Sequence, residues 1–283
     1  MKILNLLPDK VYISLQYFKY FRCFPNFRSP KTFNEKLQWL KVNNRKDIYT
    51  TMVDKYRVKK YVSDIIGEEY VIPTLGVWDS PEEIDFSVLP NEFVLKWNHD
   101  SGSVIICRNK NKLNKEAIIK KLDEFKSHNG YWYGREWPYK NVVPCIIAEQ
   151  YLENGKEGLV DYKFYCFNGE PQFLYVSKGL DNHETASISF LTMEWEFAPY
   201  KRNDFKAFEE VPQKPSKFME MIEIARALSK GHDFIRVDLY QVEEKVYFSE
   251  LTFYPCAGYM RFSNPEHDLE VGEMLELTST EIK

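Results

Sequence analysis

The chain has 283 residues, a net charge of −4 and five cysteines. This length can bury a substantial core, in one large domain or in two to three subdomains. The net charge provides no general attraction to nucleic acid or to an anionic membrane. The odd number of cysteines, without C-x-x-C or a metal-like grouping with histidine, favours reduced thiols. The first nine residues break too early for a signal peptide and no run approaches the ~20 apolar residues of a spanning helix, so we expect a soluble cytoplasmic protein.

The first 45 residues or so have a helical and aromatic pattern. Thr32-Phe-Asn-Glu35 has the form of a capping box and predicts the start of a helix. A second helix is expected from about residue 50 to residue 62. Residues 17–28 alternate aromatic and basic side chains. They predict either a helix docked on the core, which we favour, or a peripheral contact with a glycolipid at the membrane surface or with a sugar chain.

From residue 92 the pattern changes to short strands and hairpins. Apolar or alternating runs predict strands at 93–97, 104–107 and 142–152, a hairpin at 161–176, and two further strands at 234–240 and 246–255. The Asn168-Gly169 pair marks the turn of the first hairpin. Further helices are expected to begin at Asn114 and Ser216. The predicted fold class is therefore α+β with antiparallel hairpins.

The last two strands carry the most informative side chains. Because side chains alternate with period two, Arg236 and Asp238 share one face of the first strand, and Glu250 and Thr252 share one face of the second. The four groups converge if Asp238 pairs with Glu250, a register that requires an odd-length turn centred near Glu244. Two facing carboxylates repel each other unless a cation is present. The pattern predicts either a solvated edge hairpin or a magnesium site with Arg236 beside it to hold phosphate.

A lysine within an apolar strand marks a second candidate site. Burying Lys96 costs desolvation unless its ammonium group reaches solvent or an anion. The turn that follows, residues 99–103, contains Ser101, Gly102 and Ser103, whose small size lets backbone N–H groups surround a phosphate. No Walker motif is present. An edge-strand lysine beside an ordinary turn explains these residues about equally well.

The apolar strand before residue 153 ends in Glu149-Gln150-Tyr151-Leu152. Backbone groups at such a strand end can supply the acceptor and the donor that adenine requires, beside a flat apolar slot. Alone this pattern is unspecific, because many strands end in polar residues. Lys163 alternates with aromatic neighbours, so its side chain is expected on the opposite face of its strand.

In this order, the features resemble the ATP-grasp fold, in which two α+β subdomains grip ATP. The chain resembles more narrowly the TupA-like ATP-grasp family, named for teichuronopeptide biosynthesis and found in gene clusters for cell-surface polysaccharides. The segments that carry this resemblance are Lys31–Leu40, Asp54-Lys55, Leu95–Gly102, Arg135–Lys140, Glu149–Leu152 and Glu250–Pro255. The resemblance covers about residue 30 to residue 275. It implies a helical N-terminal region and connector (1–88), a small subdomain (89–152) and a large subdomain with the metal site (153–283).

The resemblance also implies roles for these side chains in binding ATP and Mg²⁺. Lys96 and Lys163 would hold the phosphates, with residues 101–103 forming the phosphate loop. Residues 149–152 would form the adenine hinge, largely through their backbone. Arg236 would bind the transferring phosphoryl group, so that it and the two lysines form the expected catalytic set.

The implied metal ligands are Asp238 and Glu250. Thr252 stands where many ATP-grasp enzymes carry asparagine. A hydroxyl is a weaker metal ligand than an amide carbonyl, so Thr252 is expected to bind metal through water or not at all. The N-terminal region differs from the usual α/β substrate domain, and no substrate site is carried over to it.

The activity implied is that of an ATP-dependent carboxylate–amine ligase that forms an amide through an acyl phosphate. Its expected partners are a small amine and a uronic-acid carboxylate of a surface (capsular) polysaccharide, free, nucleotide-linked or lipid-linked. A glycosyltransferase of polysaccharide biosynthesis is one alternative, although the chain contains no D-x-D triplet for a nucleotide sugar. A non-catalytic ATP-binding or glycan-binding module is another. Release of ADP on adding a carboxylate acceptor distinguishes the ligase from this module.

Overall fold

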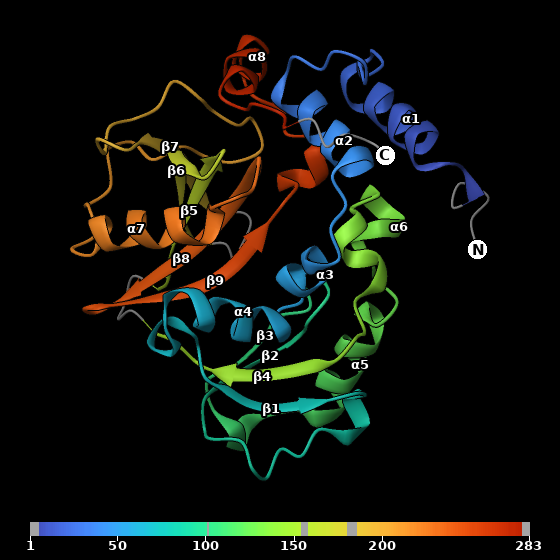
Figure 1. Ribbon diagram of the computed structural model, residues 1–283. Coiled ribbons are helices and arrows are strands. Elements are labelled where there is room, and N and C mark those ends of the chain that lie inside the picture. The colour runs from blue at the N-terminus through green and yellow to red at the C-terminus, as the bar shows by residue number, and fades with distance from the viewer. Residues whose placement is uncertain (1–5, 101, 154–157, 180–185, 279–283) are drawn as a thin grey trace. The chain divides into compact units, whose positions relative to one another are not determined.

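A computed structural model describes residues 6–100, 102–153, 158–179 and 186–278. The chain divides into two compact units (Figure 1). The smaller unit contains residues 46–153, and the larger unit joins residues 1–45 to residues 154–283. The first 45 residues thus share a unit with the C-terminal half. The predicted three-part division, with boundaries after residues 88 and 152, stays a prediction.

The smaller unit is built on a four-stranded antiparallel sheet with the strand order β1-β4-β2-β3. Its strands are β1 (Thr74–Trp78), β2 (Phe93–Trp97), β3 (Ile105–Cys107) and β4 (Ile146–Gln150). Its helices are α3 (Ile48–Val53), α4 (Arg57–Ile66), α5 (Lys115–Phe125) and α6 (Gly130–Gly134). Alternate side chains of β2 and β4 form a core with α5, where the Trp97 indole N–H donates to the Leu122 carbonyl (2.8 Å). Lys96 and Glu149 alternate with these core residues and therefore lie on the opposite face of the sheet.

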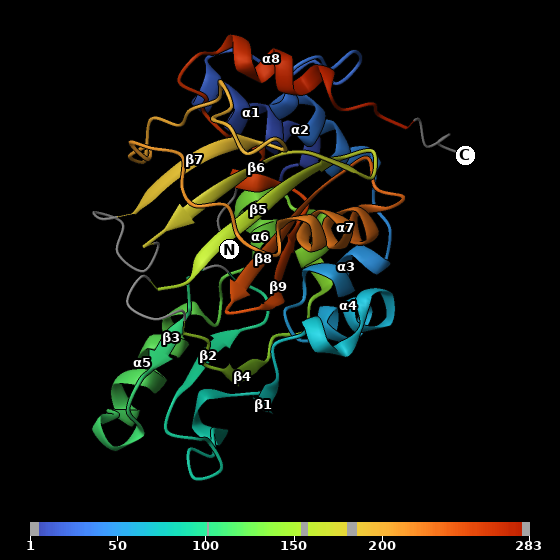
Figure 2. The same ribbon diagram turned by 90° about the vertical axis from the view of Figure 1, so that its left-hand side faces the viewer.

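The larger unit contains a five-stranded antiparallel sheet with the order β7-β6-β5-β8-β9 (Figure 2). Its strands are β5 (Val160–Phe167), β6 (Glu170–Lys178), β7 (Ser187–Thr192), β8 (Phe234–Val242) and β9 (Lys245–Thr252). Its helices are α1 (Asp9–Phe21), α2 (Phe33–Asn43), α7 (Phe218–Ser229) and α8 (Glu266–Glu273). Helix α7 packs on β5, β6 and β8. On the other face, Phe33 of α2 packs against Tyr165, Phe167 and Phe234. One end of that face is therefore apolar and covered.

Local sequence signals explain several element boundaries. The Thr32 hydroxyl accepts from the Glu35 N–H while the Glu35 carboxylate accepts from the Thr32 N–H, which confirms the capping box. Asn168 and Gly169 both have positive φ (49° and 88°), as the predicted two-residue hairpin turn requires. Asn114 caps α5 as predicted. The α+β class is confirmed.

The single helix predicted at residues 50–62 is wrong. The chain forms α3 and α4 instead, because the Asp54 carboxylate accepts from the N–H groups of Tyr56 and Arg57. An aspartate in that arrangement satisfies donors at the start of α4 and leaves Asp54 outside either helix. The helix expected from Ser216 begins two residues later. Within the described ranges, no helix has the length and apolar character needed to cross a membrane.

Candidate active site

The charged residues of the last hairpin converge in the predicted register. Asp238 on β8 pairs with Glu250 on β9, and Arg236 pairs with Thr252. Because paired residues of an antiparallel sheet project to the same side, the two carboxylates, the guanidinium and the hydroxyl share one face. This is the face opposite α7.

The turn that produces this register differs from the prediction. A two-residue turn joins β8 to β9, not an odd-length one. The register of the pairing instead shifts by one residue inside the hairpin, since Leu239 faces Phe248 while Asp238 faces Glu250. Ser249 is therefore the extra residue of a β-bulge, which corrects the offset.

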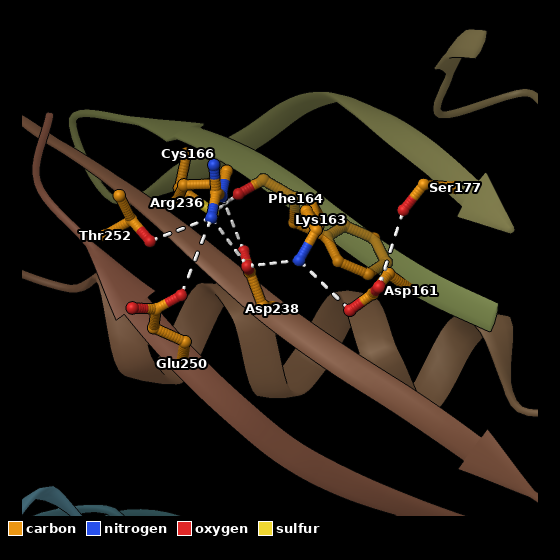
Figure 3. A network of polar contacts seen from close by, with 9 residues as sticks. All are labelled: Asp161, Lys163, Phe164, Cys166, Ser177, Arg236, Asp238, Glu250 and Thr252. Carbon is orange, nitrogen blue, oxygen red and sulfur yellow. Dashed lines mark hydrogen bonds and ion pairs between the residues drawn. The ribbon is translucent and has the colours of Figure 1, made fainter. Parts of the chain in front are cut away.

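Asp238 lies at the centre of the site, with none of its surface exposed (Figure 3). Arg236 donates from Nε to Oδ1 (2.6 Å) and from Nη2 to Oδ2 (2.7 Å). Lys163, opposite Asp238 on β5, donates from Nζ to the same Oδ2 (2.7 Å) and to Asp161 (3.0 Å). The prediction that Lys163 faces away from its aromatic neighbours is confirmed. Asp238 thus holds two buried cations in fixed positions.

These charges stabilise one another despite their burial. Burial raises the pKa of Asp238, but Arg236 and Lys163 outweigh it and hold this pKa below its ordinary value. Burial lowers the pKa of Lys163 and of Arg236, yet the neighbouring carboxylates raise both well above their ordinary values. With Asp161 and Glu250, three carboxylates face two cations. The excess negative charge favours a further cation.

Glu250 and Thr252 form the more open side of the cluster. The Thr252 hydroxyl accepts from Arg236 Nη2 (2.9 Å), and Glu250 Oε2 lies 3.9 Å from the same nitrogen. Arg236 thus bridges the two facing carboxylates, whose repulsion calls for positive charge. The carboxylate pair fits Mg²⁺, which proteins commonly bind through one or two carboxylates together with phosphates and water. Across the described ranges, no group of three or more His, Cys, Asp or Glu side chains could hold a metal ion.

In the smaller unit, Lys96 reaches a buried anion. Its Nζ lies 2.5 Å from Glu149 Oε2, and Lys59 Nζ on α4 lies 2.6 Å from Oε1. Burial raises the pKa of Glu149, but the two lysines outweigh it and hold this pKa below its ordinary value. Sequence reasoning missed Lys59. The available signal was its position three residues before the buried Val62, at the edge of the apolar face of α4.

The polar turn after β2 is stabilised by its own hydrogen bonds. The Ser103 hydroxyl accepts from the Trp97 N–H (2.9 Å) and donates to the Asp100 carboxylate (2.6 Å). Gly102 has φ +119°, a conformation that favours glycine. Ser101 lies outside the described residues. Ser103 is buried, and its side chain therefore shapes the loop, while the role of this loop as a phosphate contact stays a prediction.

The predicted adenine hinge follows the end of β4. The Gln150 N–H donates to the Pro73 carbonyl (3.0 Å), and the Tyr151 hydroxyl accepts from Arg108 Nε (3.0 Å). Leu152 is buried. These contacts tie the strand end to its surroundings, while its role in adenine binding stays a prediction.

The described residues predicted for the site divide between the two units. The larger unit brings together Lys163, Arg236, Asp238, Glu250 and Thr252, and the smaller unit holds Lys96, Gly102, Ser103 and Glu149–Leu152. Two antiparallel α+β units, each with a lysine and a carboxylate paired on one sheet face, are the arrangement expected of an ATP-grasp protein. More specifically, the chain belongs to the TupA-like ATP-grasp family, whose sequence model matches residues 35–276.

Several solved ligases are similar in structure at low sequence identity. D-Alanine–D-alanine ligase from Bacillus anthracis is 16% identical, with a TM-score of 0.42 over 72% of this chain and 57% of that one. The Helicobacter pylori ligase is 16% identical, with a TM-score of 0.44 over 86% and 69%. The ATP-grasp ligase PsnB, complexed with minimal precursor, Mg and ADP, is 10% identical, with a TM-score of 0.40 over 83% and 60%. The chain spans little more than half the length of the Bacillus ligase. No curated protein sequence matches it.

Proposed function

We propose that this protein is a Mg²⁺- and ATP-dependent carboxylate–amine ligase. The observation that carries the proposal is the convergence of Lys163, Arg236, Asp238 and Glu250 on one sheet face. Phosphoryl transfer requires in-line positioning and neutralisation of spread negative charge, with little covalent help from the protein. The cluster contains cations suited to phosphate oxygens and carboxylates suited to a metal. Family membership supports ATP as the nucleotide.

In the larger unit, Asp238 and Glu250 would hold Mg²⁺, with Thr252 contributing through water or not at all. The bound metal would neutralise phosphate charge. Lys163 and Arg236 would each exchange a contact with Asp238 for a phosphate oxygen, Arg236 taking the transferring phosphoryl group. Their pairing with a fully buried carboxylate keeps both cations oriented before the nucleotide arrives.

In the smaller unit, Lys96 would hold ATP phosphates, with residues 101–103 as the phosphate loop. Lys59 would assist, because it shares the Glu149 carboxylate with Lys96 and so presents a second ammonium group on the same side of the sheet. Glu149 would thereby position both lysines. The backbone of residues 149–152 would form the adenine hinge.

In the proposed reaction, a carboxylate oxygen attacks the γ-phosphorus of ATP, and the bond from this phosphorus to the departing ADP oxygen breaks. An amine nitrogen then attacks the carbonyl carbon of the acyl phosphate. Phosphate leaves, and the nitrogen releases a proton to form a neutral amide. We assign the carboxylate to a uronic acid of a cell-surface polysaccharide and the nitrogen to an amino acid or amine, from the family's association with such gene clusters. We place the reaction in the cytoplasm, in line with five unpaired cysteines.

Titration calorimetry with ATP, with and without magnesium, tests the nucleotide and metal sites together. Magnesium-dependent binding supports them and justifies measuring ADP release with uronic acids and amines. Binding under neither condition contradicts the proposal and favours the glycosyltransferase or glycan-binding alternatives.

The variant Glu250→Gln tests the metal site alone. Its side chain is partly exposed and 3.9 Å from Arg236, so the fold should persist while MgATP turnover falls by about 100-fold or more. Glu244→Gln, in the exposed turn of the same hairpin, is the matched control and should keep full turnover. Unchanged turnover in Glu250→Gln would contradict the assignment of this carboxylate.

A further inference from the structure

The larger unit contains a cavity of about 420 Å³ that none of the proposed roles uses. Its lining includes Tyr20, Arg202, Asp204, Cys256, Tyr259 and Arg261. The volume lies within the range of small-molecule sites. The lining combines two arginines with two tyrosines, a composition suited to a ligand that has both an anionic group and an apolar flat face.

One wall of the cavity is aromatic. The rings of Tyr20 on α1 and Tyr259 stack with centroids 4.7 Å apart and planes 12° from parallel. Arg261 lies over the Tyr20 ring (5.5 Å from guanidinium carbon to centroid) and donates from Nη2 to the Tyr20 carbonyl (2.9 Å). The contact fixes this arginine beside the tyrosine pair. Tyr259 is buried, whereas Tyr20 is 39% exposed, so the exposed part of the Tyr20 ring is the apolar surface that a sugar ring can contact.

The second arginine already holds a carboxylate. Arg202 donates from Nε and Nη2 to the two carboxylate oxygens of Asp204 (2.8 and 2.5 Å). The Arg202 side chain is recessed at 14% exposure, whereas Asp204 is 54% exposed. Burial lowers the pKa of Arg202, but the hydrogen bonds that it donates to Asp204 outweigh this and hold the pKa above its ordinary value. An exposed aspartate therefore occupies a two-pronged site that a ligand carboxylate could take over.

Part of the cavity lining comes shortly after β9, the strand that carries Glu250 and Thr252. Cys256 lies four residues after Thr252, and both Cys256 and Ala257 have φ +52°, a strained region for residues other than glycine. Two buried side chains of α2 hold this segment: Gln38 donates to the Gly258 carbonyl and Lys41 to the Ala257 carbonyl (2.6 Å each). The strained segment is therefore fixed by its surroundings, as functional strain requires.

A buried tyrosine lies next to the Arg236 cluster and is influenced by two residues of the cavity lining. The Tyr165 side chain is fully buried, and among the described residues its hydroxyl has no hydrogen-bond partner. Tyr165 pairs with Arg236 across β5 and β8, and the pKa of its hydroxyl, raised by burial, is also influenced by Cys256 and Arg202 of the cavity lining. A buried hydroxyl without a partner is costly, and a bound polar group removes that cost. Tyr165 thus lies beside Arg236 of the cluster and close enough to Arg202 and Cys256 of the cavity lining for their charges to act on it.

From these contacts we propose that the cavity is the acceptor site for a carboxylated pyranose. The sugar ring packs against the exposed part of Tyr20, and its carboxylate displaces Asp204 from Arg202. Arg261 contacts the sugar at the rim. This inference rests on the proposed function, because it assigns the uronic-acid substrate of that reaction to a defined place.

The test compares methyl β-D-glucuronide with methyl β-D-glucoside by saturation-transfer NMR at millimolar concentration, while calorimetry measures MgATP binding on the same proteins. We expect the glucuronide to bind at least about tenfold more tightly than the neutral glycoside, and Arg202→Gln to abolish that preference. Lys201→Gln, which removes the neighbouring exposed cation, is the matched control and should bind as the unmodified protein does. Equal binding of the two glycosides, or an unaltered preference in Arg202→Gln, overturns the proposal.

The variant Asp204→Asn tests the exchange directly. Removing the internal carboxylate should strengthen glucuronide binding, whereas a purely structural Arg202–Asp204 pair predicts no gain. Unchanged or weaker glucuronide binding overturns the proposal that the ligand carboxylate displaces Asp204. MgATP affinity should stay the same in every variant, so loss of glucuronide binding with normal MgATP binding contradicts this site alone. If the unmodified protein does not bind MgATP, this result contradicts the proposed function instead.

Discussion

Replacing Glu149 with glutamine should destabilise the smaller unit strongly. Glu149 is 5% exposed, and its carboxylate oxygens lie 2.5 Å from Lys96 Nζ and 2.6 Å from Lys59 Nζ. Glutamine keeps one oxygen acceptor but leaves two recessed ammonium groups without a counter-charge. Breaking a buried ion pair by removing one partner costs about 3–5 kcal/mol. Because the amide retains a partial contact, we expect a loss near the lower end, about 3 kcal/mol.

The matched control lies on the same helix as Lys59. Lys60 pairs with Asp64 at 2.5 Å, but the two side chains are 80% and 59% exposed. Water screens this pair, so Asp64→Asn should change the stability by no more than about 0.5 kcal/mol. Both variants replace a carboxylate that pairs with a lysine of α4, and the two carboxylates differ strongly in burial.

Hydrogen exchange of the β2 and β4 amides in increasing urea measures this effect, because these strands belong to the smaller unit alone. With a urea dependence of about 2 kcal/mol per molar, the opening midpoint in Glu149→Gln should fall by about 1.5 M. A shift equal to that of Asp64→Asn would refute the claim that burial makes this ion pair strong.

The same variant has a defined pH dependence. The pKa of Glu149 is lowered in the folded protein, so its stabilisation is present above the unfolded value of about 4.3 and is lost as the pH falls through the folded pKa. The stability difference between the unmodified protein and Glu149→Gln should therefore be full at pH 7 and shrink below about pH 4. A difference that stays constant down to pH 3 would contradict the lowered pKa.

Three further outcomes are expected. Asp238→Asn should lower the stability of the larger unit by about 3–5 kcal/mol in urea unfolding at pH 7, because two buried cations lose their shared carboxylate; a loss under about 1 kcal/mol would argue against the cluster. Thr252→Val should lower the free energy of unfolding by about 1.5 kcal/mol, because Arg236 loses a hydrogen-bond acceptor. If the hydroxyl is no metal ligand, the affinity for MgATP, measured by calorimetry, should stay nearly unchanged. The double variant Leu15→Gln/Phe18→Gln should weaken cosedimentation with phosphatidylglycerol vesicles by about tenfold. Unchanged cosedimentation of this variant would favour the interpretation in which this region only docks on the core.

The vesicle prediction follows from the surface of α1. Tyr12, Ile13 and Tyr17 are buried in the larger unit, as the core-docking interpretation of this region requires, but Leu15 and Phe18 are 49% and 41% exposed. Residues 6–31 contain five basic residues and a single acidic one, against the net charge of −4 for the whole chain. An apolar helix face with this charge is complementary to an anionic bilayer.

Short-range patterns in the sequence were sufficient for much of the fold. The capping box at Thr32 and the hairpin turn at Asn168-Gly169 involve residues at most three positions apart, so local chemistry determines them. Strand alternation likewise predicted that Arg236 and Asp238 share one face of β8 and that Glu250 and Thr252 share one face of β9. These features depend on backbone geometry that neighbouring residues define by themselves.

Tertiary structure decided what local patterns leave open. The bulge at Ser249 maintains the Asp238–Glu250 pairing although the turn is short, since register depends on the whole sheet. Lys59 reaches Glu149 across 90 positions of sequence, and Tyr20 stacks on Tyr259 across nearly the whole chain. Such partners are selected by packing and by the need to pair buried charges, which act between residues that the sequence keeps far apart. The sequence alone therefore determined which chemical groups the protein has on each strand, and the tertiary structure decided which of them meet.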